Sequence, residues 1–314
     1  MAFPTKQEIV DAHKRITPFI HRTPVLTSKN INSLLGIELY FKCENLQKVG
    51  AFKIRGATNA VMQLSEEDVK KGIATHSSGN HAAALALAGK NRDTTAYVVM
   101  PENSPRVKVE AVNSYGAKIT FCKPTLESRE TTLDAIVKEK GATFIHPYNN
   151  KHVITGQATA CKELIEDSPV LDYIIAPIGG GGLLSGTLLS ANYFASKTMV
   201  IGAEPAGADD AYRSIQTGKR LPSVLPNTIC DGLLSALGTL TFPIIRDFVS
   251  EIITVSEDSI IEAMRLIYER MKLVVEPSAA VTLAVIAENR DLFKGKSVGL
   301  ILSGGNVDLP RLPF

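Results

Sequence analysis

The sequence of 314 residues has little net charge, no long apolar run and few cysteines. Its net charge of +2 argues against a surface that binds nucleic acid. No apolar run reaches about 18 residues and no apolar signal segment follows Met1, so we expect neither a membrane partner nor a targeting segment. The four cysteines are scattered and form no C-x-x-C pair, which is typical of a reducing compartment. These absences predict a soluble, cytoplasmic protein.

Motifs of several common enzyme classes are also absent. The sequence has no G-x-G-x-x-G fingerprint and no Walker lysine, so it does not indicate a dinucleotide or P-loop site. His76 and His81 form no H-E-x-x-H pair, and no Cys/His cluster has the spacing of zinc ligands. No G-x-S-x-G elbow occurs, which disfavours an α/β-hydrolase.

Strand-forming and helical patterns alternate along the chain. This alternation predicts an α/β fold with parallel sheets covered by helices on both faces. The length allows two lobes, and we expect residues 73–147 to form a small inserted domain and residues 1–72 and 148–314 a large one. Ligands of such folds bind at the carboxyl ends of the strands, here in the cleft between the lobes. The clearest predicted strands are 39–42, 95–100, 118–121, 172–178, 199–203 and 298–302, and the clearest helix is 258–267, capped by Ser256 or Asp258.

Four consecutive glycines, Gly179, Gly180, Gly181 and Gly182, lie between a predicted buried strand and a predicted helix. Without side chains in the way, several backbone N–H groups can converge on one anion, and the helix adds its positive dipole end. We interpret the turn as a cup for a monophosphate. The alternative is a flexible glycine loop without a ligand.

Lys53 follows a predicted strand and begins a predicted helix. The positive end of a helix dipole disfavours an ammonium group, so this position favours the neutral amine that imine formation requires. A solvated lysine is the alternative.

Two further turns carry polar side chains. Residues 73–83 again pass from strand to helix, and Ser77, Ser78 and Asn80 offer donors for a carboxylate or a phenolic oxygen. An ordinary helix cap is the alternative there. Ser303 lies in a glycine turn at the end of the last predicted strand.

Taken in order, Lys53, the turn with Ser78 and Asn80, the four glycines and Ser303 resemble the fold-type II pyridoxal-phosphate enzymes. The resemblance is to the branch of serine racemases and serine/threonine dehydratases, and it covers nearly the whole chain, from about residue 23 to 308. It implies a fold like that of the tryptophan synthase β-subunit, with the cofactor between two lobes, and a homodimer. Residues 77–81 are similar to the racemase form, since many dehydratases carry alanine before Gly-Asn-His.

The resemblance implies a role for each residue of the cofactor site. Lys53 would hold pyridoxal 5′-phosphate covalently and act as one of two acid/base groups. Ser303 would share a hydrogen bond with the pyridine nitrogen; a serine cannot keep this nitrogen protonated, which suits racemisation and β-elimination better than transamination. The other contacts would come from Phe52 and Gly232 on the two faces of the ring, Asn80 at its phenolic oxygen and Gly179–Gly182 at the phosphate.

Racemisation needs an acid/base group on each face of the substrate Cα. The resemblance implies Lys53 on one face and Ser78 on the other. Elimination to a keto acid and ammonia needs only Lys53, so one site would serve both reactions. The substrate, a small hydroxy amino acid, would be bound by Ser77, Ser78, His81, Arg129 and Ser235. For Arg129, a solvated helix arginine is the alternative.

Residues 204–210 place carboxylates and exposed carbonyls in one short turn, the ligands that a hard divalent cation prefers. The alternative is that Asp209 or Asp210 caps the following helix. In the branch that the chain resembles, matching positions bind magnesium or calcium, which implies a site for Mg²⁺, Ca²⁺ or Mn²⁺ at Glu204, Ala208 and Asp210. ATP enhances the activity of some animal members of this branch, so the resemblance implies ATP as an effector of this protein.

Tyr148 replaces the asparagine of animal serine racemases and is nearer to fungal members, some of which deaminate 3-hydroxyaspartate. Three functions therefore stay open. The motifs favour a serine racemase with serine/threonine dehydratase activity. The second is a dedicated ammonia-lyase for L-threonine, L-serine or threo-3-hydroxyaspartate. The third is a non-catalytic sensor, which could dispense with Lys53, Ser78 and Asn80.

Overall fold

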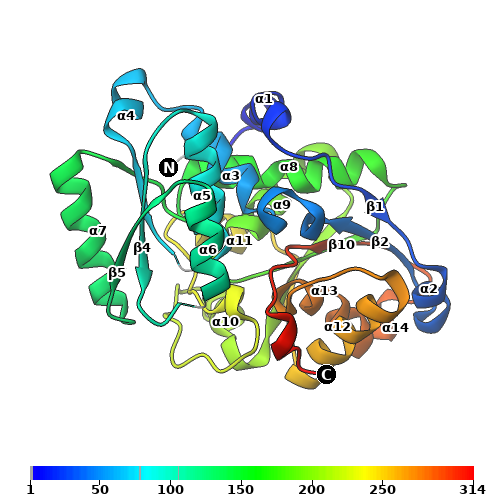
Figure 1. Cartoon of the computed structure of the whole chain (residues 1–314). Helices are drawn as coiled ribbons and strands as arrows, with labels where there is room; N and C mark the ends of the chain where they lie inside the picture. The colour runs from blue at the N-terminus through cyan, green and yellow to red at the C-terminus, as the bar shows by residue number, and fades with distance from the viewer. Residues whose placement is uncertain (1–2, 78, 105) are drawn as a thin grey trace.

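The computed structural model describes residues 3–77, 79–104 and 106–314, and it contains two β-sheets with helices packed around them (Figure 1). The larger sheet has six strands in the order β1-β2-β10-β7-β8-β9. β1 runs antiparallel to β2, and the other neighbouring pairs are parallel. The strands are β1 (Val25–Leu26), β2 (Glu38–Cys43), β7 (Tyr173–Pro177), β8 (Met199–Pro205), β9 (Glu251–Val255) and β10 (Ser297–Leu302).

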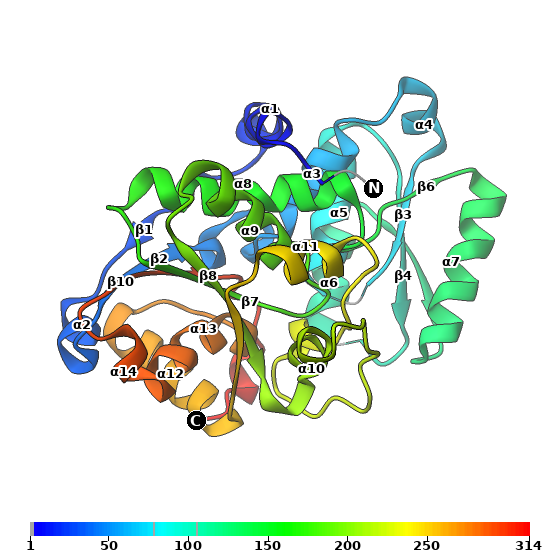
Figure 2. The same cartoon turned by 180° about the vertical axis from the view of Figure 1, so that it is seen from behind.

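The smaller sheet has four parallel strands in the order β5-β4-β3-β6. These strands are β3 (Ile73–His76), β4 (Ala96–Pro101), β5 (Lys118–Cys122) and β6 (Thr143–Phe144). Both views show α7 (Leu126–Lys140) beside this sheet at one end of the molecule, and α12 (Glu257–Met271) and α13 (Pro277–Glu288) at the other end (Figures 1 and 2). The other helices are α1 (Lys6–Ile16), α2 (Lys29–Leu35), α3 (Lys53–Val61), α4 (Glu66–Lys71), α5 (Asn80–Asn91), α6 (Arg106–Ser114), α8 (Lys151–Asp167), α9 (Gly182–Phe194), α10 (Asp210–Thr217), α11 (Thr241–Phe248) and α14 (Arg290–Phe293).

The central strand β7 explains why the larger sheet needs helices on both faces. All five of its residues are buried, and successive side chains point to opposite faces. Ile175 packs in a core formed with α12 and α13. Ile174 and Ala176 pack in a second core with α9. A strand buried on both sides positions its carboxyl end firmly, and the four-glycine turn begins there.

The predicted α/β fold with parallel sheets is confirmed, and the predicted strands agree with the observed ones to within one or two residues. The helix predicted at 258–267 is α12, and Ser256 caps it by accepting a hydrogen bond from the N–H of Ser259; of the two proposed caps, Asp258 lies inside the helix. In the part of the chain that the structure describes, no helix has both the length and the apolarity needed to cross a bilayer.

Candidate active site

Lys53 is the first residue of α3, as predicted, and the start of this helix is tied to the turn after β10. The N–H of Phe52 donates to the carbonyl of Ser303 (N···O 3.0 Å). Ala51 forms a β-bridge with Gly304. These contacts bring Lys53 and the buried Ser303 together although they are far apart in the sequence.

The amine of Lys53 is half-buried rather than solvated, and its partner is a carbonyl. Its Nζ donates to the carbonyl oxygen of Pro147 (3.0 Å) and lies 5.1 Å from the ring centroid of Phe52. Burial lowers the pKa of Lys53 from 10.5 to about 8, and Glu276 opposes this shift. A considerable fraction of the amine is therefore neutral near physiological pH, with burial adding to the helix-end effect expected from the sequence.

The four-glycine turn joins β7 to α9, as predicted. The N–H groups of Gly179, Gly180 and Gly181 have no hydrogen-bond acceptor among the described residues. The next N–H groups lie in the first turn of α9, where a helix offers no partner. Gly181 has a φ of +85°, a conformation that favours glycine. The turn therefore presents several free donors at the positive end of a helix, as an anion site requires.

Tyr148 packs directly on this turn. A Cβ atom at Gly180 would lie 2.4 Å from the Tyr148 ring, and one at Gly182 would lie 2.9 Å from the Tyr148 Cβ. Lys53 binds the carbonyl of the preceding residue, Pro147, so residues 147–148 connect the lysine to the glycine turn. Close packing against Tyr148 therefore requires glycine at positions 180 and 182, independently of any anion bound by the N–H groups.

Gly232 lies in the short turn Asp231–Leu233, against the other side of the glycine turn. A Cβ at Gly179 would lie 2.9 Å from the Cα of Leu233 and 3.1 Å from the carbonyl oxygen of Gly232. The N–H of Gly232 donates to Oγ of Ser278 (3.1 Å) at the start of α13. The predicted cofactor residues described so far therefore converge from the ends of β7 and β10, the start of α3 and the turn Asp231–Leu233.

Asn80 begins α5, and its side chain is held by a residue that the sequence did not indicate. Its Nδ2 donates to Oε1 and Oε2 of Glu276 (3.0 and 3.1 Å), and its Oδ1 accepts from Nδ2 of Asn306 (2.9 Å). Asn80 therefore does not act as an ordinary helix cap. The N–H of Glu276 donates to the carbonyl of Gly304 (3.0 Å), so this network joins the Ser303 turn. The only sequence signal was a glutamate directly before Pro277 and an apolar helix.

Two of the predicted substrate residues lie near this network. His81 is buried, and burial and the charge of Lys53 lower its pKa to about 3. Because a carbonyl only accepts, Nε2 of His81 carries the proton that it donates to Ile145 (3.1 Å), and Nδ1 is a buried acceptor without a partner among the described residues. Oγ of Ser77 accepts from the N–H of Gly79 (3.3 Å). Ser78, the predicted second catalytic residue, lies outside the described residues.

The other two predicted substrate residues are less closely connected. Ser235 is exposed and lies beside Tyr148; burial raises the pKa of Tyr148, and the Ser235 hydroxyl opposes that shift. Arg129 is half-buried on α7, beside His76, and its Nε has no partner in the described part of the chain. Arg129 is therefore only partly exposed to solvent, and its contact with the substrate stays a prediction.

The predicted metal ligands lie at the start of α10. Glu204 and Asp210 are buried, and burial raises the pKa of both, to about 8 for Glu204. Glu204 accepts from the N–H groups of Ala211 (2.9 Å) and Tyr212 (2.8 Å), so Glu204 caps this helix and Asp209 makes no side-chain cap bond. Oδ2 of Asp210 has no partner among the described residues, and Ala208 is buried in the turn just before. Among the described residues, no group of three or more His, Cys, Asp or Glu side chains is placed to hold a metal ion, and the predicted set of two carboxylates and a carbonyl stays a prediction.

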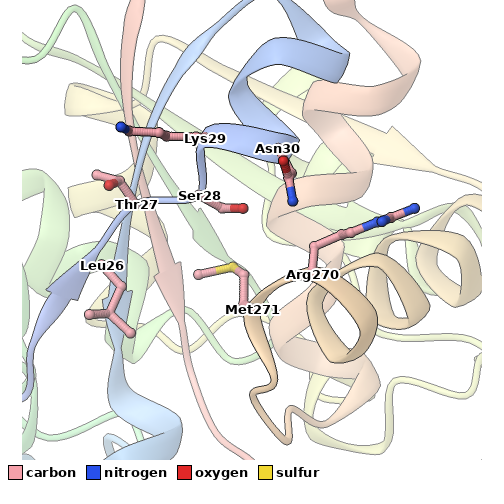
Figure 3. Close-up of a pocket in the computed structure, with 7 residues that line it drawn as sticks. All are labelled: Leu26, Thr27, Ser28, Lys29, Asn30, Arg270 and Met271. Atoms are coloured by element: carbon pink, nitrogen blue, oxygen red, sulfur yellow. The ribbon is translucent and has the colours of Figure 1, made fainter.

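A separate cavity of about 320 Å³ lies between the start of α2 and the end of α12 (Figure 3). None of the residues that line it belongs to the predicted site. They are Leu26, Thr27, Ser28, Lys29, Asn30, Arg270 and Met271.

The geometry agrees with comparisons to known proteins. A family model described as "Pyridoxal-phosphate dependent enzyme" matches residues 16–304. The serine racemase of Dictyostelium discoideum is 53% identical over 317 residues, covering 99% of this chain and 98% of that protein. The beta-hydroxyaspartate dehydratase of Paracoccus denitrificans is 49% identical, covering 100% of each. The crystal structure of the Dictyostelium serine racemase matches with a TM-score of 0.94 at 52% identity, covering 98% of this chain and 100% of that one. The chain therefore belongs to the family of pyridoxal-phosphate dependent enzymes.

Proposed function

We propose that this protein interconverts L- and D-serine and also deaminates serine or threonine by β-elimination. The observation that carries the proposal is the half-buried amine of Lys53, with its lowered pKa, linked through Pro147 and Tyr148 to a turn whose N–H groups have no acceptor among the described residues. The similarity to a serine racemase supports this choice of reaction. So does the Ser-Ser-Gly-Asn-His form of residues 77–81.

The residues of this site fit pyridoxal phosphate. The N–H donors of Gly179–Gly182, which have no acceptor among the described residues, would hold the phosphate, and the Lys53 amine would hold the carbonyl carbon. Asn80 would bond the phenolic oxygen and Ser303 the pyridine nitrogen, with Phe52 and Gly232 on the two faces of the ring. When bound, the cofactor supplies an electron sink for the electrons left at the substrate Cα after proton loss.

The chain's own residues would move the protons. Lys53 would take and return the Cα proton on one face of the substrate, and Ser78 on the other. Elimination uses the Lys53 face alone, so the ratio of the two products depends on Ser78. Nδ1 of His81 is an acceptor without a partner among the described residues. It therefore suits the substrate hydroxyl, which can donate, better than the carboxylate, which can only accept. Ser77, Arg129 and Ser235 would provide the remaining substrate contacts.

We also propose a divalent cation at Glu204, the Ala208 carbonyl and Asp210. Both carboxylates are buried, Asp210 contributes to the raised pKa of Glu204, and Oδ2 of Asp210 has no partner among the described residues. These features fit a hard cation such as Mg²⁺, Ca²⁺ or Mn²⁺. A further proposal is the division into a small domain, residues 73–147, and a large one, because all four strands of the smaller sheet fall inside that segment. The homodimer and ATP as an effector are predictions that rest on the resemblance, and the cytoplasmic location is a prediction that rests on the scattered cysteines.

A dedicated lyase for threo-3-hydroxyaspartate is the second candidate. The similarity to beta-hydroxyaspartate dehydratase and the tyrosine at position 148 favour it. The candidates are separated by incubating the purified protein and Mg²⁺ with L-serine, L-threonine or L-threo-3-hydroxyaspartate, and measuring both the keto acid and the D-amino acid. D-serine together with pyruvate from L-serine supports the racemase. Keto acid without any D-serine supports the lyase.

A further inference from the structure

Glu276 is a buried carboxylate that does not serve the helix it precedes. It directly precedes α13, yet its side chain makes no capping hydrogen bond to that helix. Glutamate is also not among the residues that usually occupy this position. Glu276 is only 4% exposed, and a buried carboxylate is costly unless it is paired or hydrogen-bonded. Its place in the fold therefore calls for a different explanation.

The side-chain contacts of Glu276 supply that explanation. Both of its oxygens accept from Nδ2 of Asn80, at 3.0 and 3.1 Å. On the other side of the same amide, Oδ1 of Asn80 accepts from Nδ2 of Asn306 (2.9 Å), which also donates to the carbonyl of Val49 (2.7 Å). An ionised carboxylate can only accept, and an amide nitrogen can only donate. The network therefore permits one orientation of the Asn80 amide.

We infer that Glu276 is a positioning residue that fixes the Asn80 amide with its nitrogen towards the carboxylate, keeping a second Nδ2 hydrogen available to the phenolic oxygen of pyridoxal phosphate. This inference rests on the proposed role of Asn80 in the cofactor site. Glu276 acts through Asn80 and takes no part in proton transfer.

Charged groups on several elements face Glu276. Burial and Asp231 raise the pKa of Glu276 to about 7, and Lys108 of α6 opposes them. Asp231 is itself ion-paired with Lys108, and Lys53 of α3 also faces Glu276. At pH 8 the carboxylate is mostly ionised and fixes the amide. At pH 6 it is mostly protonated and can also donate, which removes the preference for one orientation of Asn80.

The test is a double-mutant cycle at pH 8 with two readouts, the affinity for pyridoxal phosphate and the absorption spectrum of the holoenzyme. Glu276→Gln keeps the shape but can present either oxygen or nitrogen to Asn80. We expect the affinity to fall about tenfold and the spectrum to change, because charge-assisted hydrogen bonds are the stronger ones. In the Asn80→Ala background the same substitution should change the affinity by less than about twofold.

Two further variants serve as a control and as a second substitution at position 276. Glu288→Gln, at the exposed far end of α13, is the matched control and should change neither readout. Glu276→Ser places a favoured capping residue before α13, so it should fold even if Glu276→Gln does not, and it should lower the affinity at least as much. An unchanged affinity and spectrum in both position-276 variants overturns the inference, and so does an equal loss with and without Asn80. If Asn80→Ala alone changes nothing, the proposed cofactor role of Asn80 fails instead.

Discussion

The amines of Lys42 and Lys53 are both shielded from water, but they bind different kinds of partner. Lys42 is fully buried, and its Nζ lies 2.7 Å from Oε2 of Glu163 and 2.7 Å from the carbonyl of Thr23. Lys53 is half-buried, and its Nζ binds the carbonyl of Pro147 (3.0 Å). Burial lowers the pKa of both amines, but a carboxylate in contact holds only Lys42 in its charged form.

Lys42 belongs to a buried charge cluster formed by Lys42, Glu44, Arg55 and Glu163. Nε of Arg55 lies 2.7 Å from Glu44, and its Nη2 lies 2.7 Å from Glu163. Burial alone would lower the pKa of Arg55, but Glu44 and Glu163 outweigh burial and raise it. The charges of the two cations and the two carboxylates cancel, so we interpret the cluster as a structural element of the fold.

Arg55 stands two residues after Lys53 on α3, so the same helix carries a cation paired with carboxylates and an amine that is unpaired, because no carboxylate of the described residues contacts it. The paired one anchors the helix to Glu44, which directly follows β2, and to Glu163 of α8. The unpaired one has a lowered pKa, which favours the neutral form that the proposed role of Lys53 requires. A buried cation therefore indicates a reactive group only where no carboxylate contacts it.

We expect the largest effect on activity from removing the amine of Lys53. Lys53→Ala should lose both D-serine and pyruvate formation from L-serine to below detection, because no other described amine occupies its place. We expect the purified wild-type protein to be yellow from bound pyridoxal phosphate and the Lys53→Ala protein to be colourless. Lys42→Met should keep the colour even if it is less stable; cofactor retention in Lys53→Ala together with its loss in Lys42→Met would reverse the assignment.

Ser78→Ala tests whether Lys53 and Ser78 act on opposite faces of the substrate. Racemisation of L-serine should fall by about 10²–10⁴-fold, the scale of general acid/base catalysis, while pyruvate formation from L-serine falls far less. Elimination from D-serine should fall with racemisation, because Ser78 must then take the first proton. Chiral chromatography and a coupled pyruvate assay follow the two products. Racemisation at close to the wild-type rate would place the second base elsewhere.

Breaking the charge cluster should cost stability rather than chemistry. Arg55→Met leaves Glu44 and Glu163 short of a buried cation, which should lower the free energy of unfolding by about 3–5 kcal/mol. Urea unfolding measures the change. The control is Arg22→Ala, which removes the exposed pairs with Glu166 and Asp167 and should cost only about 0–1 kcal/mol. Equal losses in the two variants would show that the buried cluster is no more important than a surface pair.

The pH dependence of cofactor attachment tests the lowered pKa of Lys53. The neutral amine attacks the cofactor's carbonyl, and the neutral fraction rises with pH until it passes the pKa. Attachment to the cofactor-free protein should therefore speed up about tenfold per pH unit below pH 8 and level off above it, as expected from a pKa of about 8. Stopped-flow absorbance gives the profile. A rise that continues to the ordinary lysine value of 10.5 would contradict the effect of burial.

Cation binding at Glu204 and Asp210 should have the smallest effect on rate. Chelation should lower pyruvate formation about a few-fold, and Mg²⁺ should restore it. Because burial raises the pKa of Glu204 to about 8, Glu204 is mostly protonated at pH 7, so binding should release up to about one proton per ion. Calorimetry in buffers of different ionisation enthalpy measures this release. An Asp210→Asn protein that responds to Mg²⁺ as wild type does would exclude the site.

Local sequence patterns were enough to predict the strand-to-helix junctions. Runs of apolar residues ending in glycine predicted β7 and the start of α9, and the position of Lys53 at the start of α3 followed from the same reasoning. The partners of those residues could not be predicted, because they depend on which turns the two sheets bring together. Glu276 binds a residue 196 positions away, and nothing near it in the sequence suggests that contact.

The metal turn shows the same limit. The sequence suggested Asp209 or Asp210 as the cap of α10, whereas Glu204 takes that role from the end of β8. Helix capping by a residue of a neighbouring strand is set by tertiary packing, which local propensity does not contain. The four glycines were interpreted through their donors alone, and their packing against Tyr148 became visible only in the fold.

The contrast between Lys42 and Lys53 is tested most directly by reducing the holoenzyme with borohydride. Reduction fixes the cofactor on whichever amine holds it, and mass spectrometry of the digested protein identifies that lysine. The expected result is modification of Lys53, with Lys42 unmodified. A modification on Lys42 or on any other lysine would contradict it.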